Sequence, residues 1–258
     1  MVADAAQVNE GEPVVIDLHN HILRYVVKLP VHPTDPDIET AVRMALIAQE
    51  DGIRTIVSTP HFRPERLGER AAEMFDVLHS AVDILNTTLQ ERGIDVEVLT
   101  GAEVAMCEQL PELANRGLLP TLAGGRHVLI ELPMGTYAPY AEDVLFKLQL
   151  KGYKPVIAHF ERLADAPVKH ISPRVLQERG IKLQVNCESL MGRRGRKVQE
   201  LAQHLLRDDL VSALGSDAHD PDNTPPRLTP CRPAVDRAGG TGAFERIVSR
   251  RAAAIIGR

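Results

Sequence analysis

The sequence predicts an α/β fold in which seven parallel strands form one distorted barrel with helices around it, a (β/α)7 variant of the TIM barrel. Strand-like and helix-like segments alternate through almost the whole chain, which is typical of a parallel sheet. The length of 258 residues is close to the about 250 that a single barrel of this kind uses. Residues 13–258 are therefore expected to form one domain, preceded by a flexible N-terminal arm at residues 1–12.

The strands are predicted from short β-branched runs that are bounded by turn residues or charges. In chain order they cover Val14–Leu18, Thr55–Ser58, Val96–Leu99, Val128–Leu132, Pro155–Ala158, Lys182–Val185 and Val211–Leu214. Most of them are followed by a segment long enough for a helix, so neighbouring strands are expected to run parallel.

The helices follow the 3.6-residue period of their apolar positions. The first covers Ile38–Gln49, with Asp35 and Pro36 suited to begin it and Gly52 to end it. A longer helix after Pro64 carries its apolar stripe at Met74, Val77, Leu78, Ala81, Leu85 and Leu89. Further helices are predicted at Ala141–Leu150, Arg174–Arg179, Val198–Leu206 and Ala243–Ile256. The proline- and glycine-rich tract Asp220–Gly240 is predicted to be a loop that covers or borders a site.

Composition excludes several classes of protein. No apolar run approaches the about 20 residues needed to span a bilayer, so membrane insertion is not expected. The N-terminus has neither the basic nor the apolar part of a secretory signal, which favours the cytoplasm. Three cysteines without metal-type spacing are expected to be reduced thiols. A net charge of -5 disfavours a nucleic-acid partner, and the oligomeric state is left open.

One basic run, RRGRK at Arg193–Lys197, stands out from this acidic background. Such a run is usually a solvated surface, and here it could also receive a phosphorylated or acidic partner.

Metal-type polar residues follow five of the strands, in the segments IDLHNH, STPH, TGAEV, IAHFER and GSDAH. The C-terminal ends of parallel strands converge on one face of a barrel, so these side chains should meet there. His19 and His21 are two residues apart on an extended segment, as are Asp217 and His219, so each pair can bind one ion. Imidazoles and carboxylates without thiolates suit manganese, iron, zinc or, less well, magnesium.

Any one of these histidines taken alone would more often be a hydrogen-bonded structural residue. The combination is what predicts a metal site, with the candidates His19, His21, His61, Glu103, His159, Asp217 and His219. Four histidines off this pattern are assigned structural roles: His79, His127, His170 and His204.

In their order, the segments DLHNHIL, IRTIVSTPH, GAEV, VLIELP, PVIAHFERL, LQVN and GSDAH resemble the polymerase and histidinol phosphatase (PHP) superfamily. TIVSTPH and PVIAHFER are most similar to the manganese-dependent bacterial protein-tyrosine phosphatases of capsule and exopolysaccharide operons, the CpsB/CapC type. The resemblance runs from about Val15 to Pro226 and implies the PHP variant of the barrel.

The resemblance implies two or three divalent ions, with manganese as the first choice. Its first ion would be held by His19, His21, Glu103 and Asp217. Glu103 would bridge to a second ion that is also bound by His159. A third ion would use His61 and His219 with one more residue, for which an ungapped alignment offers Lys28 and a small insertion offers His32. We favour His32, because neutral imidazole is an ordinary ligand and lysine is not.

The resemblance also implies residues for the reaction. Arg162 would clamp the phosphate with its planar guanidinium, and Arg227, about three positions later than the family pattern, would help to bind the substrate. Asp217 and His219 belong to the catalytic group with Arg162, and His219 or Asp220 could act as a weak general acid.

A second motif of the sequence suggests a different mechanism. CESLMGR, from Cys187 to Arg193, satisfies the C-x5-R spacing of cysteine-dependent tyrosine phosphatases, which attack phosphate with a thiolate. The loop has Gly192 as its single glycine and Asn186 where a histidine is usual, so a packed, unreactive Cys187 is preferred.

These observations predict hydrolysis of a phosphomonoester by metal-activated water. The resemblance makes phosphotyrosine on a protein the expected substrate and a polysaccharide-export tyrosine kinase the expected partner. Two alternatives stay open at this point: a small-molecule phosphatase, such as one acting on histidinol phosphate, and a PHP fold retained as a non-catalytic docking module.

Overall fold

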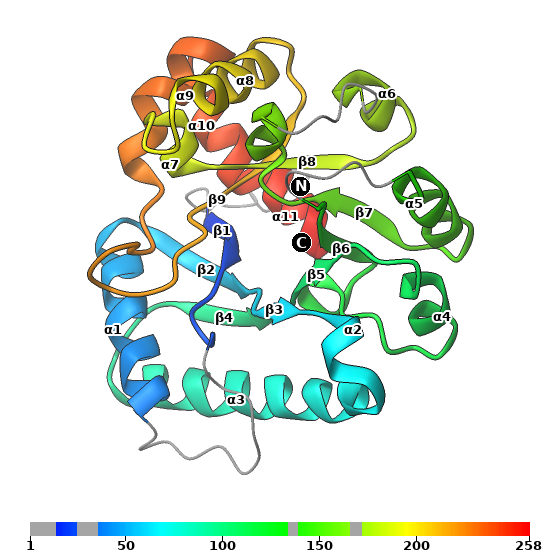
Figure 1. Ribbon diagram of the computed structural model, residues 1–258. Coiled ribbons are helices and arrows are strands. Elements are labelled where there is room, and N and C mark those ends of the chain that lie inside the picture. Colours follow the sequence, from blue (N-terminus) through cyan, green and yellow to red (C-terminus); the bar gives the residue numbers. More distant parts are fainter. Residues whose placement is uncertain (1–13, 25–35, 134–138, 166–171) are drawn as a thin grey trace, which may run out of the picture.

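The computed structural model describes residues 14–24, 36–133, 139–165 and 172–258 (Figure 1). Its named strands pair only in parallel, in one sheet of order β1-β2-β4 and a second of order β3-β5-β6-β7-β8-β9. The first sheet contains β1 (Val15–Asn20), β2 (Ile53–Ser58) and β4 (Glu97–Thr100). The second contains β3 (His61–Phe62), β5 (Glu103–Ala105), β6 (His127–Glu131), β7 (Lys154–Ile157), β8 (Lys182–Asn186) and β9 (Val211–Gly215).

All seven predicted strands are confirmed, and β3 and β5 are additions. Each continues an earlier strand after a break of two residues, β3 after β2 and β5 after β4. The break after β2 contains Pro60, which has no N–H group for a ladder. Because β3 and β5 pair with His61 opposite Glu103, the two breaks deliver both side chains to one place.

The two sheets meet at the C-terminal ends of β1 and β9. The backbone N–H of His21 donates to the carbonyl of Ala218 over 2.8 Å, and that of Asp217 donates to the carbonyl of His19 over 2.8 Å. The predicted parallel α/β arrangement is thus confirmed. In the described residues the two sheets do not share one continuous ladder, and a closed barrel stays a prediction.

The predicted helices are confirmed as α1 (Pro36–Glu50), α3 (Ala71–Glu91), α5 (Ala141–Leu150), α6 (Pro173–Glu178) and α8 (Arg196–Arg207). The C-terminal helix consists of α10 (Ala243–Glu245), a π-helical segment (Arg246–Arg251) and α11 (Ala252–Ile256). The sequence did not predict α2 (Pro64–Leu67), α4 (Leu110–Asn115) or α7 (Cys187–Leu190) as separate helices.

The loop predicted for Asp220–Gly240 is wrong in its second half, where α9 (Arg232–Gly239) forms. Pro233 lies in the first turn of α9, where a missing N–H group costs no hydrogen bond. Gly240, with a φ of 86°, ends the helix instead of interrupting it. A short 3-10 turn, Thr229–Cys231, precedes α9, so the irregular part is limited to the residues before it.

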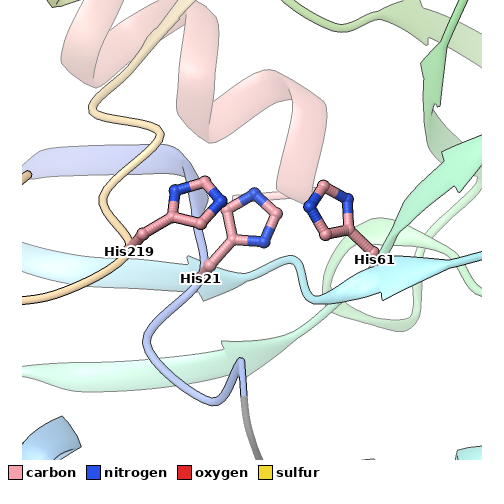
Figure 2. A group of neighbouring side chains, drawn as sticks. All are labelled: His21, His61 and His219. Atoms are coloured by element: carbon pink, nitrogen blue, oxygen red, sulfur yellow. The ribbon is translucent and has the colours of Figure 1, made fainter.

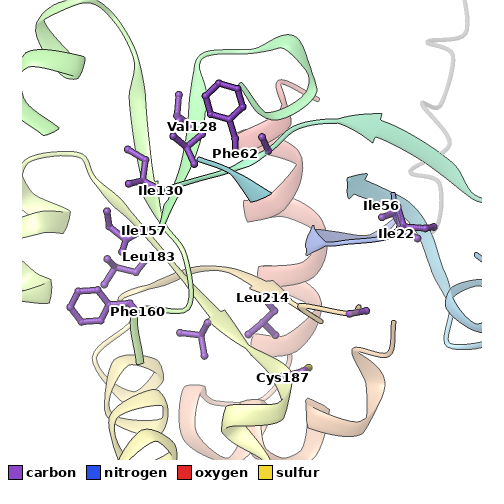
Figure 3. Close-up of a cluster of buried hydrophobic side chains, with 14 of the residues drawn as sticks. Ile22, Ile56, Phe62, Val128, Ile130, Ile157, Phe160, Leu183, Cys187 and Leu214 are labelled. Carbon is purple, nitrogen blue, oxygen red and sulfur yellow. The ribbon is translucent and has the colours of Figure 1, made fainter. Parts of the chain in front are cut away.

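Apolar side chains cover both faces of the larger sheet. Val128 and Ile130 of β6 belong to a cluster between the strands and the surrounding helices (Figure 3). Leu129, between them, belongs to a smaller cluster on the opposite face, which Ile255 and Ile256 of α11 help to fill. Strands buried on both faces explain why their sequences are apolar runs without strict alternation.

The prediction of three reduced cysteines is wrong. Cys187, at the start of α7, forms a disulfide with Cys231, 44 residues later, and their Cα atoms are 5.4 Å apart. The partners approach because α7 packs against the turn Thr229–Cys231, a contact that sequence spacing does not reveal. Cys107 is free and buried.

Among the described residues, no helix combines the length and the apolar character that crossing a membrane requires. The predicted arm at residues 1–12 lies outside the described residues.

Candidate metal centre

The structure brings the metal-type residues of six strands into one cluster. The segments that carry them stand at or directly after the C-terminal ends of β1, β6, β7 and β9, while His61 and Glu103 are the first residues of β3 and β5. Their side chains form three overlapping groups with ligand atoms within 4.8 Å of one another: His19, His21 and Asp217; His61, Glu103 and Glu131; and His21, His61 and His219.

The first group is buried. His19 Nε2 and His21 Nε2 lie 3.1 Å apart, and Asp217 Oδ1 is 3.2 Å from the latter and 3.5 Å from the former. Nitrogen lone pairs that point at each other repel unless a proton or a cation lies between them. His21 Nδ1 has no hydrogen-bond partner among the described residues, so a hydrogen bond at this atom does not account for the burial of the ring. This donor set fits a divalent metal ion.

Glu103 lies between the groups. One carboxylate oxygen is 2.8 Å from His159 Nε2, and the other is 2.8 Å from His61 Nδ1. The same carboxylate is 3.5 Å from His21 Nε2 and 3.6 Å from His19 Nε2. An acid with imidazoles on both sides has the position needed to bridge two ions.

Glu131, the last residue of β6, is a member of the cluster that the sequence reasoning missed. Its carboxylate lies 3.7 Å from His159 Nε2 and 3.8 Å from Arg63 Nη2. The signal was present in VLIELP, because an acid there ends a strand at the same face as the other candidates.

The structure also brings together His61 and His219, the pair expected at a third ion, with His21 between them (Figure 2). The ring centroids of His21 and His219 are 4.1 Å apart, and those of His21 and His61 are 4.5 Å apart. His219 Nδ1 lies 2.7 Å from the carbonyl oxygen of Asp217, to which it donates, so its Nε2 is free to bind. His32 and Lys28, the alternatives for this group, lie outside the described residues.

Two predicted arginines differ in their placement. Arg162 is partly buried, and its Nη1 lies 3.6 Å from Asp217 Oδ2, at the edge of the cluster. Arg227 pairs instead with Glu50 at the end of α1, over 3.5 Å. No contact found in the described part of the chain joins Arg227 to the cluster, so its substrate-binding role stays a prediction.

Burial and charge act in opposite directions on the titrating groups. Burial by itself would lower the pKa of His19, but the carboxylates of Glu103 and Asp217 raise it to about 10. Burial prevails at His21 and lowers its pKa to about 4. Burial would raise the pKa of Glu103 and of Asp217, yet the charge on His19 and imidazole hydrogen bonds hold both pKa values below the ordinary range.

Two residues of the cluster adopt left-handed backbone conformations. His159 has a φ of 30° and Asp217 a φ of 54°, which residues with a Cβ rarely adopt. Such conformations cluster at functional sites, where the surrounding structure holds them in place.

Asp17, a buried residue of β1, holds two segments together. Its carboxylate accepts hydrogen bonds from the backbone N–H of Ser216 over 2.9 Å and from Asn20 Nδ2 over 2.8 Å. It thereby fixes the end of β1 beside the segment that carries Asp217.

The other described histidines have the structural roles expected of them. His127 Nδ1 donates to the carbonyl of Ile255 over 2.7 Å, while His79 and His204 are exposed on helices. His170 lies outside the described residues.

The rival C-x5-R loop is not assembled. Cys187 is bonded to Cys231, so it has no thiolate to attack phosphate. The exposed guanidinium of Arg193 pairs with Glu188 over 3.4 Å instead of closing a loop around Cys187.

Sequence comparisons agree on the relatives of this chain. The model of the family described as "Capsular polysaccharide synthesis, CpsB/CapC" matches residues 15–257. Tyrosine-protein phosphatase YwqE of Bacillus subtilis is 34% identical over 206 residues, which cover 80% of this chain and 77% of that protein. Tyrosine-protein phosphatase CpsB of Streptococcus pneumoniae is 28% identical over 222 residues, 83% of this chain and 86% of that protein.

Solved structures extend the comparison. A chain from the crystal structures of YwqE from Bacillus subtilis and CpsB from Streptococcus pneumoniae, described as unique metal-dependent tyrosine phosphatases, is 28% identical with a TM-score of 0.79 and covers 94% of both chains. Molinate hydrolase, 12% identical with a TM-score of 0.57 over 95% of this chain and 73% of its own, shares the fold alone. With a family match that extends over nearly all of its length, this chain belongs to the CpsB/CapC family.

Proposed function

We propose that this chain is a metal-dependent protein-tyrosine phosphatase, which hydrolyses phosphotyrosine with water as the nucleophile. The observation that carries the proposal is the 3.1 Å approach of His19 Nε2 and His21 Nε2 beside Asp217 and Glu103, in a member of the CpsB/CapC family. Its relatives YwqE and CpsB are tyrosine-protein phosphatases.

We assign the ligands to three positions, of which two or three are occupied in the active protein. The first comprises His19, His21, Glu103 and Asp217. The second comprises Glu103, Glu131 and His159. The third comprises His61, His219 and His32. Manganese is our first choice, with iron, zinc and magnesium as alternatives. Bound there, the ions would supply an activated water and positive charge for an in-line displacement.

The residues of the chain would do the remaining work. Arg162 stands beside Asp217, where its guanidinium could bind two phosphoryl oxygens and stabilise the charge that develops on them. A phenolate, whose conjugate acid has a pKa near 10, leaves without strong help from a general acid.

The choice of general acid favours His219 over Asp220. Backbone N–H groups of Asn223 and Asp222 donate to the Asp220 carboxylate and lower its pKa, so this acid is ionised and occupied in its own loop. His219 lies in the cluster, and it can act as the acid when the third position is empty, because its Nε2 is the atom that would otherwise bind the ion.

The remaining parts of the proposal concern the barrel, the cellular location of the protein and its partner. We propose that the two sheets work as one distorted seven-stranded barrel, that the protein acts in the cytoplasm, and that its partner is a polysaccharide-export tyrosine kinase. The hydrogen bonds between the segments after β1 and β9 support the first part. The basic run at Arg193–Lys197 is exposed, and its arginines pair with Glu188 and Glu200 at the surface, where such pairs are weak. An acidic peptide could compete for these charges, which supports a peptide substrate over a metabolite.

The function is tested by metal removal. Metal-stripped protein is expected to lose at least about 100-fold of its activity on a phosphotyrosine peptide and to regain it with manganese, because the ions supply the nucleophile. Histidinol phosphate, offered in parallel, distinguishes a small-molecule phosphatase. Activity that is indifferent to chelation, or turnover of histidinol phosphate alone, would contradict the proposal, and no turnover of either substrate would favour a docking module.

Metal binding is expected to release about one proton per chain at pH 7 from the first position. The pKa of His19 is raised to about 10, so this ring is protonated there, while His21, with a pKa of about 4, is already neutral. Because the displaced proton comes from a group with a raised pKa, manganese affinity should rise with pH until His19 deprotonates.

Calorimetric titration in two buffers with different ionisation enthalpies measures this proton release. His204→Gln, a change at an exposed histidine of α8, should leave it unchanged. Manganese binding without proton release would place the ion away from His19.

A further inference from the structure

Two amide side chains lie directly behind the ligand cluster, Gln184 and Asn186 of β8. Both are buried, with 0% and 1% of their surface exposed. They are two residues apart on one strand, so their side chains share a face of the sheet. Buried amides need partners for every donor and acceptor, and here the partners decide which way each amide faces.

The orientation of Gln184 follows from a backbone donor. The N–H of His159 can only donate, and it lies 2.8 Å from Gln184 Oε1, so the oxygen of the amide faces it. The same oxygen lies 3.0 Å from His19 Nδ1. An amide oxygen only accepts, so Nδ1 of His19 must carry the proton. When the ring gives up its second proton to a bound ion, the lone pair is therefore on Nε2, the atom that faces His21.

The orientation continues through Asn186. Gln184 Nε2 donates to Asn186 Oδ1 over 2.8 Å, which turns the Asn186 amide nitrogen toward Asp217. Asn186 Nδ2 then donates to Asp217 Oδ2 over 2.8 Å. The other carboxylate oxygen of Asp217, Oδ1, is the one that faces both histidines of the first group.

Gly215 provides the space for this arrangement. A Cβ atom at Gly215 would lie 2.5 Å from His19 Cβ and 2.8 Å from Gln184 Nε2. Any larger residue at this position would therefore displace the side chains of His19 and Gln184. The strand β9 therefore approaches closely enough for the amide of Gln184 to reach both His19 and His159.

We propose that Gln184 and Asn186 are positioning residues of the metal centre: Gln184 fixes the tautomer of His19, and Asn186 aims Asp217. Hydrogen-bonded neighbours of metal ligands raise affinity by fixing ring orientation and tautomer. The inference rests on the proposed ligand set. It goes beyond that set because neither amide binds the ion.

The test compares two replacements of Gln184 by their manganese affinity. Gln184→Met keeps the volume and removes both hydrogen-bond acceptances, and we expect it to weaken manganese binding by about 10- to 100-fold. Gln184→Glu keeps an acceptor for His19 Nδ1 and for the His159 N–H but loses the donor to Asn186, so it should lose clearly less manganese affinity than Gln184→Met. Binding is measured by manganese electron paramagnetic resonance on metal-stripped protein, together with thermal unfolding of the same samples.

Gln199→Met is the matched control, because Gln199 also donates to a protein carbonyl, that of Leu190, but on α8 outside the cluster. If Gln184→Met fails to fold, Asn186→Leu is tested in its place: it removes the donor to Asp217 and the acceptor for Gln184 Nε2, leaves both acceptances of Gln184 Oε1 intact, and should also weaken manganese binding. Folded Gln184→Met or Asn186→Leu protein with wild-type affinity would overturn the inference. So would equal losses in Gln184→Met and Gln184→Glu, because a merely structural amide would give that result. Wild-type protein that binds neither manganese nor iron, zinc or magnesium would instead refute the proposed function.

Discussion

Glu103→Gln is expected to lower kcat/KM for a phosphotyrosine peptide by at least about 1,000-fold and to remove at least one metal ion per chain. Glu103 is 2% exposed and has His61 and His159 at 2.8 Å on its two oxygens. An amide of the same shape has one oxygen and no charge, so it cannot bind two ions or balance the positive charge around it.

The measurements are steady-state kinetics with manganese in excess and metal content by mass spectrometry. Glu178→Gln makes the same chemical change at an exposed position of α6 and should alter neither. If Glu103→Gln keeps its activity and its metal, then the carboxylate is not a bridging ligand and the ligand assignment fails with it.

Replacing Cys187 and Cys231 together by serine is expected to lower the free energy of unfolding by about 4 kcal/mol, relative to the oxidised protein. The disulfide closes a loop with a sequence separation of 44, and cutting it returns that loop's conformational freedom to the unfolded chain. The kcat should stay within about twofold of the wild type, because neither sulfur is a proposed ligand. The Leu228 carbonyl, 3.2 Å from both sulfur atoms, can accept from the new hydroxyls.

Urea unfolding with and without a reductant measures this effect. Reduced wild-type protein is the internal comparison, and its stability should fall in the same direction. A loss of activity in the serine variant with full metal content would instead restore the thiolate mechanism, since only that mechanism needs Cys187.

The sequence predicted the parts of this fold that are local. A strand such as β6 or a helix such as α3 records its burial in its own residues, so its period or apolar run can be found without the rest of the chain. The convergence of His19, Glu103 and Asp217 was predictable too, because parallel strands must end at the same face.

The parts that were missed depend on contacts between distant segments. β3 and β5 have two and three residues, too few to establish a period, although they carry His61 and Glu103. Glu131 is a single acid in an apolar run, and only its position at the end of a strand marked it. The pairing of Cys187 with Cys231 requires α7 and the turn before α9 to pack together, which no spacing rule contains.

The breaks that separate β2 from β3 and β4 from β5 divide each strand into two parts with different functions. The first parts, β2 and β4, form one sheet with β1, and the second parts, β3 and β5, are two and three residues long and carry His61 and Glu103. A residue inserted between Ser58 and His61 would move that imidazole relative to Glu103 while leaving the β1-β2-β4 ladder in register. Insertions or deletions of one residue at the breaks could therefore change the reactivity of the site with little effect on folding.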